Sequence, residues 1–386
     1  MNLRLFATMM AMAAMTLAAT GCGSHAEDTG EKLTVATWNV GLAYNFVPLS
    51  TERQPEAIKA AASTDADVLC LQEVWTPDDV AAMEAALEAK GFAHVYVDAM
   101  EEDTTGLPIA CTAGDTQDLA PCAEKECAGS TNLVGCVQSK CGAELAAISD
   151  SCLTCLAGNL TLTLQGMLEK CGKAGGNYSW GGHHGLMLAS KVPFAKKERL
   201  VLDSTLVQRA VLHGKIDAAA GRPAMEVYCT HLTAGLSSVK YTGKLGGWEQ
   251  EQAKQIDAMG AWIDQTAAAG TAIVLLGDLN CGPEVAGKLT GEMPANWAKI
   301  TGLGFVDAWL EGGNPTCTFC GDNNLVDSGA DKGGEGSAID HIALRGFSGG
   351  TTASRIHDGK VTITGAAGSQ ESSLSDHFGL RAVLTR

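Results

Sequence analysis

The segment IVLLGDLN at residues 273–280 is a short apolar run followed by Gly277, Asp278, Leu279 and Asn280. A continuous apolar run of this length that ends at a glycine is typical of a buried β-strand. The polar side chains after it would lie at the carboxyl end of that strand, where sheets commonly present ligand-binding and catalytic groups. The segment therefore predicts a buried sheet with a polar site at one edge.

The same construction occurs three more times along the chain. VATWN (residues 35–39), VLCLQE (68–73) and VYCTH (227–231) are each apolar runs that deliver a polar side chain at their ends. One such residue could simply be a hydrogen-bonded core or turn group, but a whole series is harder to explain in this way. The series that we expect to gather at one site is Asn39, Glu73, His231, Asp278, Asn280, Asp340, Asp376 and His377.

The composition is that of a globular protein with an acidic surface. The chain has 386 residues, of which 46% are hydrophobic and 18% charged, which is enough to bury one or two full cores. Its formal net charge of -17 argues against a surface built to grip nucleic-acid phosphates regardless of sequence. A nuclease needs only local positive charge, however, so that class stays open.

The N-terminus has the pattern of an export signal. Arg4 precedes an apolar stretch at residues 5–17, and small residues lead to Cys22. Residues 19–22 resemble a bacterial lipobox, which predicts a signal peptide over 1–21, acylation of Cys22 and a polar tether over 22–32. The expected location is the cell envelope, at the outer membrane through the lipid anchor. Plain secretion is the alternative, because lipoboxes more often have leucine where Ala19 stands.

Fourteen cysteines in an exported chain predict a disulfide framework in an oxidising compartment. Eight of them lie close together and predict a self-contained, mostly helical insertion over residues 104–178: Cys111, Cys122, Cys127, Cys136, Cys141, Cys152, Cys155 and Cys171. The spacing of Cys152 with Cys155, and of Cys317 with Cys320, would also suit zinc. Apart from Cys22 an odd number remains, and Cys70, inside an apolar strand, is the expected buried free thiol.

The rest of the chain predicts an α+β fold. Helices are expected over residues 54–64, from Thr76 as N-cap to Gly91, and over 247–268. Strand-like runs occupy 33–40, 66–71, 92–97, 185–190, 198–202, 210–216, 224–230, 272–276, 339–344 and 380–384. Many strands with few helices favour two packed sheets with helices outside, in a domain over 33–386 that the insertion interrupts.

Six segments carry a resemblance to a known family. They are TWNV (37–40), LQEV (71–74), THL (230–232), GDLN (277–280), IDHI (339–342) and SDH (375–377). In order and spacing they resemble the signature of the endonuclease/exonuclease/phosphatase superfamily. The resemblance implies a four-layered α/β sandwich, in which two packed mixed β-sheets are flanked by helices. It also implies a phosphoesterase that depends on a divalent cation, usually Mg²⁺, with Mn²⁺ or Ca²⁺ as alternatives.

The residue types suit phosphodiester hydrolysis, which needs a hard cation, an activated water and donors for the transferred phosphate. Glu73 is the expected metal ligand, Asn39 orients it or binds the ion directly, and Asp376 is a second carboxylate on the metal side. By resemblance, Asp278 orients or deprotonates the water and Asn280 donates to the phosphate.

The two histidines complete the predicted chemistry. His377 would be the general base or a charged phosphate donor, with Asp340 holding its tautomer. His231 should donate to a phosphoryl oxygen or protonate the leaving group, and the sequence offers no carboxylate partner for it. Arg209 and Lys191 are expected to bind the substrate phosphate, although lone basic residues near strand ends are often solvated surface groups.

The expected partner is a phosphodiester substrate, either a phospholipid head group or a nucleic acid. THLTA (230–234) and the segment at 277–284 look closest to the neutral sphingomyelinase branch, so a sphingomyelinase or phospholipase C-like substrate is preferred. An extracellular endonuclease like deoxyribonuclease I is the alternative. A non-catalytic binding protein on the same scaffold is the alternative of another class, and no protein partner is identifiable.

Overall fold

The computed structural model describes most of the chain after the predicted export signal. The described residues are 32–99, 109–130, 132–173, 183–219, 224–236, 239–313, 316–326, 334–347, 350–365 and 368–385. The predicted signal peptide, Cys22 and nearly all of the predicted tether lie outside these residues, so lipidation stays a prediction.

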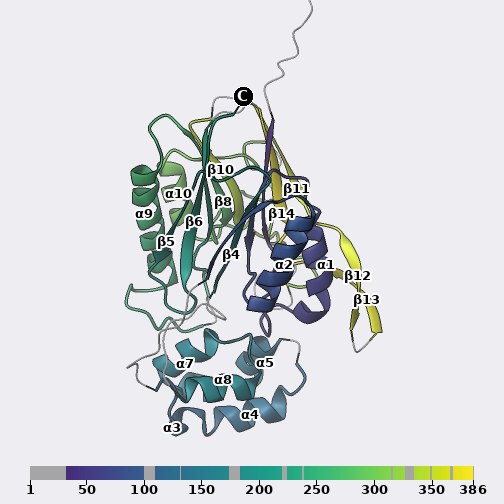
Figure 1. Cartoon of the computed structure of the whole chain (residues 1–386). Coiled ribbons are helices and arrows are strands. Elements are labelled where there is room, and N and C mark those ends of the chain that lie inside the picture. Colours follow the sequence, from purple (N-terminus) through teal and green to yellow (C-terminus); the bar gives the residue numbers. More distant parts are fainter. Residues whose placement is uncertain are drawn as a thin grey trace, which may run out of the picture.

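The first sheet is six-stranded and mixed (Figure 1). Its strand order is β11 (Thr351–Ile356), β14 (Gly379–Leu384), β1 (Leu33–Asn39), β2 (Val68–Gln72), β4 (His183–Ser190) and β3 (His94–Ala99). Only β1 and β2 run parallel, and their register pairs Asn39 with Gln72. The ends of these two strands therefore lie side by side.

The second sheet is also six-stranded and mixed. Its order is β5 (Lys196–Leu202), β6 (Arg209–Ile216), β7 (Met225–His231), β8 (Ala272–Asp278), β10 (Asp340–Arg345) and β9 (Val306–Asp307). Here β7 and β8 are the parallel pair, with His231 opposite Asp278. Antiparallel β10 begins opposite the end of β8, which pairs Asp340 with Asp278.

Helices cover the outer face of each sheet, which confirms the predicted four-layered sandwich. The helices α1 (Ser50–Ala62) and α2 (Pro77–Ala89) pack on the first sheet, and α9 (Trp248–Thr266) and α10 (Pro294–Gly302) pack on the second. The predicted start of α2 is confirmed, because the Thr76 side chain accepts a hydrogen bond from the Asp79 amide and Pro77 is the first helical residue. None of the described helices combines the length and the apolar character that crossing a membrane requires.

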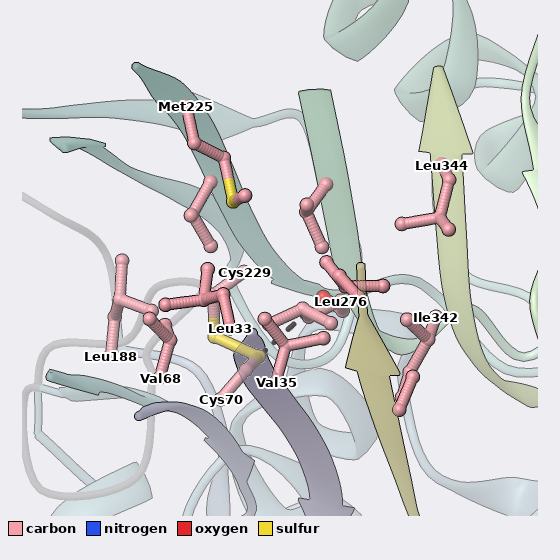
Figure 2. Close-up of a cluster of buried hydrophobic side chains, with 14 of the residues drawn as sticks. Leu33, Val35, Val68, Cys70, Leu188, Met225, Cys229, Leu276, Ile342 and Leu344 are labelled. Atoms are coloured by element: carbon pink, nitrogen blue, oxygen red, sulfur yellow. Dashed lines mark hydrogen bonds between the residues drawn. A yellow bond between two sulfur atoms is a disulfide. The ribbon is translucent and has the colours of Figure 1, made fainter. Parts of the chain in front are cut away.

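The inner faces of the two sheets form the central core, and a disulfide joins them there. Cys70 of β2 is bonded to Cys229 of β7 among buried side chains such as Val35 and Leu276 (Figure 2). The prediction that Cys70 is a free thiol is therefore wrong, and Cys281 is the free cysteine among the described residues. The sequence shows that Cys70 is buried, but it does not show which residue of the facing sheet lies opposite.

The cysteine-rich segment forms a helical unit with its own small core. Its helices are α3 (Ala113–Thr116), α4 (Leu119–Glu126), α5 (Leu133–Lys140), α6 (Gly142–Ala147), α7 (Asp150–Ala157) and α8 (Leu164–Cys171). Its eight cysteines pair only with one another, as Cys111–Cys152, Cys122–Cys141, Cys127–Cys136 and Cys155–Cys171. Cys317 and Cys320 also form a disulfide, so neither predicted zinc spacing is used for metal. The exact domain boundaries stay a prediction.

Four strands and one helix in the C-terminal half were not predicted. They are β9, β11, the two-stranded hairpin of β12 (Lys360–Gly365) and β13 (Gly368–Ser373), and helix α10. The hairpin extends away from the sandwich in Figure 1, and most of its side chains are exposed and polar. The sequence of β13, GSQESS, has no apolar side chain and β9 has only two residues, so neither shows the hydrophobic alternation that identifies a strand. The sequence of β12, KVTITG, does alternate, with Ile363 buried, and this signal was overlooked.

We expect the disulfide between the sheets to contribute strongly to stability. Replacing both Cys70 and Cys229 by alanine should lower the free energy of unfolding by roughly 2–5 kcal/mol, because the cross-link closes a long loop in the unfolded chain. The two cysteines are 159 residues apart. Urea unfolding measures the effect, and Cys281→Ala is the control that removes a buried sulfur without opening a cross-link. Equal urea midpoints for the double variant and the unchanged protein would contradict the prediction.

Candidate active site

The two parallel strand pairs and the start of β10 bring polar side chains to the same end of the sandwich. Asn39, His231 and Asp278 are the last residues of β1, β7 and β8, and Glu73 follows β2 directly. Asp340 opens β10, and Asp376 and His377 immediately precede Phe378 and β14. Strands of both sheets therefore contribute to one group of side chains, as the series of strand ends predicted.

Asn39 connects the two sheets by hydrogen bonds. Its Nδ2 donates to Glu73 Oε1 at 3.1 Å and to Asp278 Oδ2 at 3.0 Å, while its Oδ1 accepts from the Gly41 amide at 3.0 Å. Both N–H bonds of the amide are thus used to hold carboxylates. Glu73 has a left-handed backbone with φ of 61°, an unusual conformation for a residue other than glycine, and such conformations cluster at functional sites.

Asp278 lies at the centre of the group. His231 Nε2 lies 3.3 Å and His377 Nε2 lies 3.8 Å from Asp278 Oδ2. Its other carboxylate oxygen accepts from the Asn280 backbone amide at 2.9 Å, and Asn280 itself has φ of 48°. Burial favours the neutral form, but His231 and His377 outweigh it and hold the pKa of Asp278 well below its usual range. The carboxylate is therefore ionised at neutral pH.

His377 and Asp340 form the predicted pair. The distance from His377 Nδ1 to Asp340 Oδ2 is 2.9 Å, and the backbone amide of Asp340 is held by the Thr318 hydroxyl. Burial favours neutral imidazole, yet the charges of Asp340 and then Asp278 raise the pKa of His377 well above its usual value. His377 is thus a cation at neutral pH, with Nε2 directed toward Asp278.

His231, in contrast, is uncharged at neutral pH. Burial, followed by the positive charge of Arg209, lowers its pKa to about 4, so the imidazole is neutral at pH 7. Its Nδ1 has no hydrogen-bond partner among the described residues. The carboxylate partner that the sequence did not reveal is Asp278, which approaches Nε2.

The carboxylates of Glu73 and Asp376 suit a cation. Burial, and then the charge of Asp376, raises the pKa of Glu73 to about 7. Within the described part of the chain, Glu73 Oε2 has no hydrogen-bond partner although it is buried. Two neighbouring carboxylates with an unused oxygen are the donors that a divalent cation such as Mg²⁺ prefers. Asp278, Asp340 and His377 form a second group that could hold a metal ion, since their ligand atoms lie within 4.8 Å of one another.

The two predicted phosphate ligands have different positions. Arg209 belongs to this group, because Glu73 and Asp278 are among the charges that act on its guanidinium, and its Nη1 has no partner in the described structure. Lys191 does not. It follows Ser190, which pairs with Val68 at the far end of β2, and its ammonium lies 5.1 Å from the centre of the Phe92 ring. The antiparallel direction of β4 takes Lys191 to the opposite end of the sheet.

Arg53 is a fully buried residue that supports the site and that the sequence did not reveal. Its guanidinium donates to the carbonyl oxygens of Gly41, Val40 and Leu374. It thereby joins the loop after Asn39 to the segment that leads to Asp376. Nothing in the sequence distinguishes this arginine from an ordinary surface residue of an amphipathic helix.

Gly41 was also missed, and it determines how closely these two segments approach. Its φ is 59°, and a Cβ there would lie 2.5 Å from Asp376 Oδ1. Only glycine avoids both the strained backbone and the collision.

A second histidine–aspartate pair lies next to the site but faces away from it. His341 Nδ1 lies 2.9 Å from Asp307 Oδ2, and His341 Nε2 lies 2.9 Å from the carbonyl oxygen of Cys281. Because carboxylate and carbonyl groups only accept hydrogen bonds, both ring nitrogens of His341 donate. Both are therefore used to hold the loop after Asn280 to Asp307.

Comparisons with known proteins agree with this geometry. The model of the "Endonuclease/Exonuclease/phosphatase family" matches residues 36–377. No curated protein matches the chain. Solved structures that are similar to the chain include sphingomyelinase C from Streptomyces griseocarneus, with a TM-score of 0.53 and 14% identity over 92% of this chain and 99% of that one.

Two further solved structures are similar to the chain to a comparable degree. The beta toxin from Staphylococcus aureus, a mutant with bound magnesium ions, has a TM-score of 0.54 and 10% identity over 92% of this chain and all of that one (100%). A mannosyl-6-phosphatase from Bacteroides thetaiotaomicron has a TM-score of 0.50 and 13% identity over 91% of this chain and 99% of that one. At these identities the likeness concerns the fold.

The pKa of His377 should depend on Asp340. In metal-free buffer, Asp340→Asn removes the largest charge that favours the imidazolium and should lower the pKa of His377 toward its ordinary value of 6.5. Titration of the imidazole Cε1–H signals by NMR measures this shift. In the unchanged protein, the raised pKa stabilises the fold fully below about pH 6.5, and that contribution is lost as the pH rises through the folded-state value.

Asp307→Asn is the matched control for this titration, because it removes the carboxylate partner of His341 instead. It should leave the His377 signal unchanged. An unaltered His377 titration in Asp340→Asn would show that the pair does not determine the charge state.

Proposed function

The chain belongs to the endonuclease/exonuclease/phosphatase family, and on this premise we propose that it hydrolyses a phosphodiester with a divalent cation as cofactor. Members of this family are phosphoester hydrolases. The observation that carries the proposal is the pair of hydrogen bonds from Asn39 to Glu73 and Asp278. They collect acidic groups from both sheets beside a charged and a neutral imidazole, the groups that hydrolysis of a phosphate ester requires.

Glu73 and Asp376 would hold the cation, with Asn39 orienting Glu73. The unused Oε2 of Glu73 and the proximity of Asp376 support this assignment. The similar beta toxin structure contains magnesium ions, which makes Mg²⁺ the first ion to test. When bound, such a cation neutralises phosphate oxygens and favours ionisation of water.

Asp278 and Asn280 would act on the attacking water and the phosphate. The ionised Asp278 carboxylate can orient the water and accept its proton. The Asn280 side chain already donates one N–H to the Leu232 carbonyl at 3.0 Å, which leaves its second N–H for a phosphate oxygen.

The histidines and Arg209 would stabilise the developing negative charge. His377, protonated and held by Asp340, can donate from Nε2 to a phosphoryl oxygen or to the leaving oxygen. Neutral His231 carries one ring proton, which it can donate to the phosphate without adding charge. The unpartnered Nη1 of Arg209 supports a contact to the same phosphate.

The protein would act outside the reducing cytosol. Six disulfides among the described residues indicate an oxidising compartment. The signal-like N-terminus and Cys22 support export and anchoring by lipid at the cell envelope.

Three kinds of molecule could carry the phosphodiester: a lipid, a small soluble ester and a nucleic acid. Sphingomyelinase C and beta toxin support the lipid head group that the sequence favoured, and the mannosyl-6-phosphatase supports a small soluble ester. Entry into a bilayer requires exposed apolar side chains, but the described residues expose only four large ones, at scattered positions: Phe46, Ile109, Val201 and Val306. The net charge of -17 speaks against a nucleic-acid duplex.

Activity should depend on a divalent cation bound through Glu73. EDTA should abolish hydrolysis of bis(p-nitrophenyl) phosphate, and Mg²⁺ should restore it. Glu73→Gln should reduce the rate by at least about 10- to 100-fold and raise the Mg²⁺ concentration needed for half-maximal activity. Glu226→Gln is the matched control, because Glu226 is also buried but pairs with His213 at the other end of β7. Full activity of Glu73→Gln in EDTA would exclude the mechanism.

The two active-site histidines should each matter for turnover. His377→Asn and His231→Asn should each lower kcat by about 10²- to 10⁴-fold, as removal of a proton donor or acceptor typically does. His377→Asn should also lower the stability, because it removes the charged partner of the buried Asp340. Steady-state kinetics together with urea unfolding separates the two effects. A variant that unfolds normally and turns over at the original rate would remove that histidine from the mechanism.

A further inference from the structure

We propose that the disulfide-rich helical segment of residues 109–173, termed the cap, covers the catalytic end of the sandwich and restricts the site to small, water-soluble phosphate esters. This inference rests on the proposed function and specifies its substrate class.

The cap and the catalytic groups lie at the same end of the molecule. Leu33 at the start of β1 pairs with Leu384 near the C-terminus, so Asn39 at the other end of β1 points away from the C-terminus. Figure 1 shows helices α3–α8 at that end of the sandwich, opposite the C-terminus. The cap is thus next to the strand ends that deliver the catalytic groups.

On one side the cap is bonded to the loop that follows Asn39. Asn45 Nδ2 donates to the carbonyl oxygens of Leu160 at 2.6 Å and Leu162 at 3.1 Å, and its own carbonyl accepts from the Val134 amide at 3.1 Å. One residue of the first sheet's loop thereby binds two separate parts of the cap. Its left-handed backbone, with φ of 63°, directs it there.

On the other side the cap is bonded to the loop that follows His231. Thr154 Oγ1 lies 2.9 Å from Thr242 Oγ1, and Lys240 Nζ lies 2.5 Å from Asp150 Oδ1. The cap therefore bridges loops from both sheets, across the end at which their catalytic residues meet.

An apolar contact brings the cap close to the reacting groups. Leu160 packs against a buried cluster that contains Ala43, Val47 and Trp75. The Trp75 ring centre lies 6.3 Å from that of His231 and 6.0 Å from the guanidinium carbon of Arg209. Leu160 thus packs on the same small apolar cluster whose Trp75 ring lies beside His231 and Arg209.

The cap cannot easily change shape to admit a large substrate. Four disulfides cross-link it internally, and its core consists mainly of those sulfur atoms and a few apolar side chains. Beneath it, the side chains of Asp340, Asp278, His231, His377 and Asn280 are only 0–8% exposed. A small ester can diffuse to such a site, whereas a duplex or a bilayer cannot approach it while the cap is closed.

A size series on the unchanged protein tests the inference directly. The substrates are bis(p-nitrophenyl) phosphate, single-stranded oligonucleotides of increasing length, plasmid DNA and sphingomyelin vesicles. We expect kcat/KM per susceptible bond to fall by about 100-fold or more from the small diester to the plasmid and the vesicles, since access is limiting. Equal efficiency on either large substrate would overturn the cap inference and leave the proposed function intact. No hydrolysis of any substrate with Mg²⁺, Mn²⁺ or Ca²⁺ would instead refute the proposed function.

A variant with a loosened cap provides the second test. Asn45→Gly, Lys240→Ala and Thr242→Ala together remove side-chain contacts on both sides, and glycine keeps the left-handed backbone at position 45. We expect at least about a 10-fold gain on single-stranded oligonucleotides with less than about a 3-fold change on the small diester, because weaker contacts increase the open population.

Lys299→Ala is the matched control for this variant. It also removes an exposed lysine–aspartate pair, here with Asp257, but one that joins α10 to α9 within the sandwich. It should change neither rate. A loosened variant that gains nothing on long substrates, or gains equally on all of them, would overturn the inference. The size series does not depend on the variant, so it decides the question even if the triple substitution prevents folding.

Discussion

The fixed distance between the two sheets is the constraint on which the site depends. Asn39 reaches from the first sheet to Asp278 of the second, and a hydrogen bond of 3.0 Å tolerates only a small relative displacement. The Cys70–Cys229 bond ties the sheets together within the same core, three residues before Glu73 and two before His231. Close packing of the inner faces and this covalent link together hold the two halves of the site in register.

The two histidines differ in protonation, His377 being charged and His231 neutral, and both states arise from the same geometry. Both imidazoles approach Oδ2 of Asp278, but His377 has a second carboxylate, that of Asp340, on its other nitrogen. His231 has Arg209 nearby instead, which disfavours a positive charge. Two chemically identical side chains thus differ in protonation because of one extra neighbour each, a common way in which active sites assign acid and base roles.

The sequence predicted those parts of the structure that follow from the residues of a single strand. An apolar run such as residues 273–276 shows both that it is buried and where it ends, and the polar residue after it is then placed at the edge of a sheet. A strand whose side chains are all polar, such as β13, carries no such signal. Features that depend on how separate elements are placed relative to one another were also missed. They are the pairing of Cys70, the location of Lys191 at the end of the sheet opposite the site, and the buried contacts of Arg53.

The unpaired thiol of Cys281 has a consequence for the biogenesis of the protein. Its burial, next to the ionised Asp278, raises the thiol pKa far above neutral, so in the finished fold it has almost no reactive thiolate. Before the second sheet closes, however, the same sulfur is an equal competitor for every other cysteine. Correct oxidation therefore requires β8 and its flanking loop to be enclosed early, or a thiol-exchange catalyst to reverse wrong pairings. Isomers in which Cys281 is mispaired can form only while this thiol is still accessible.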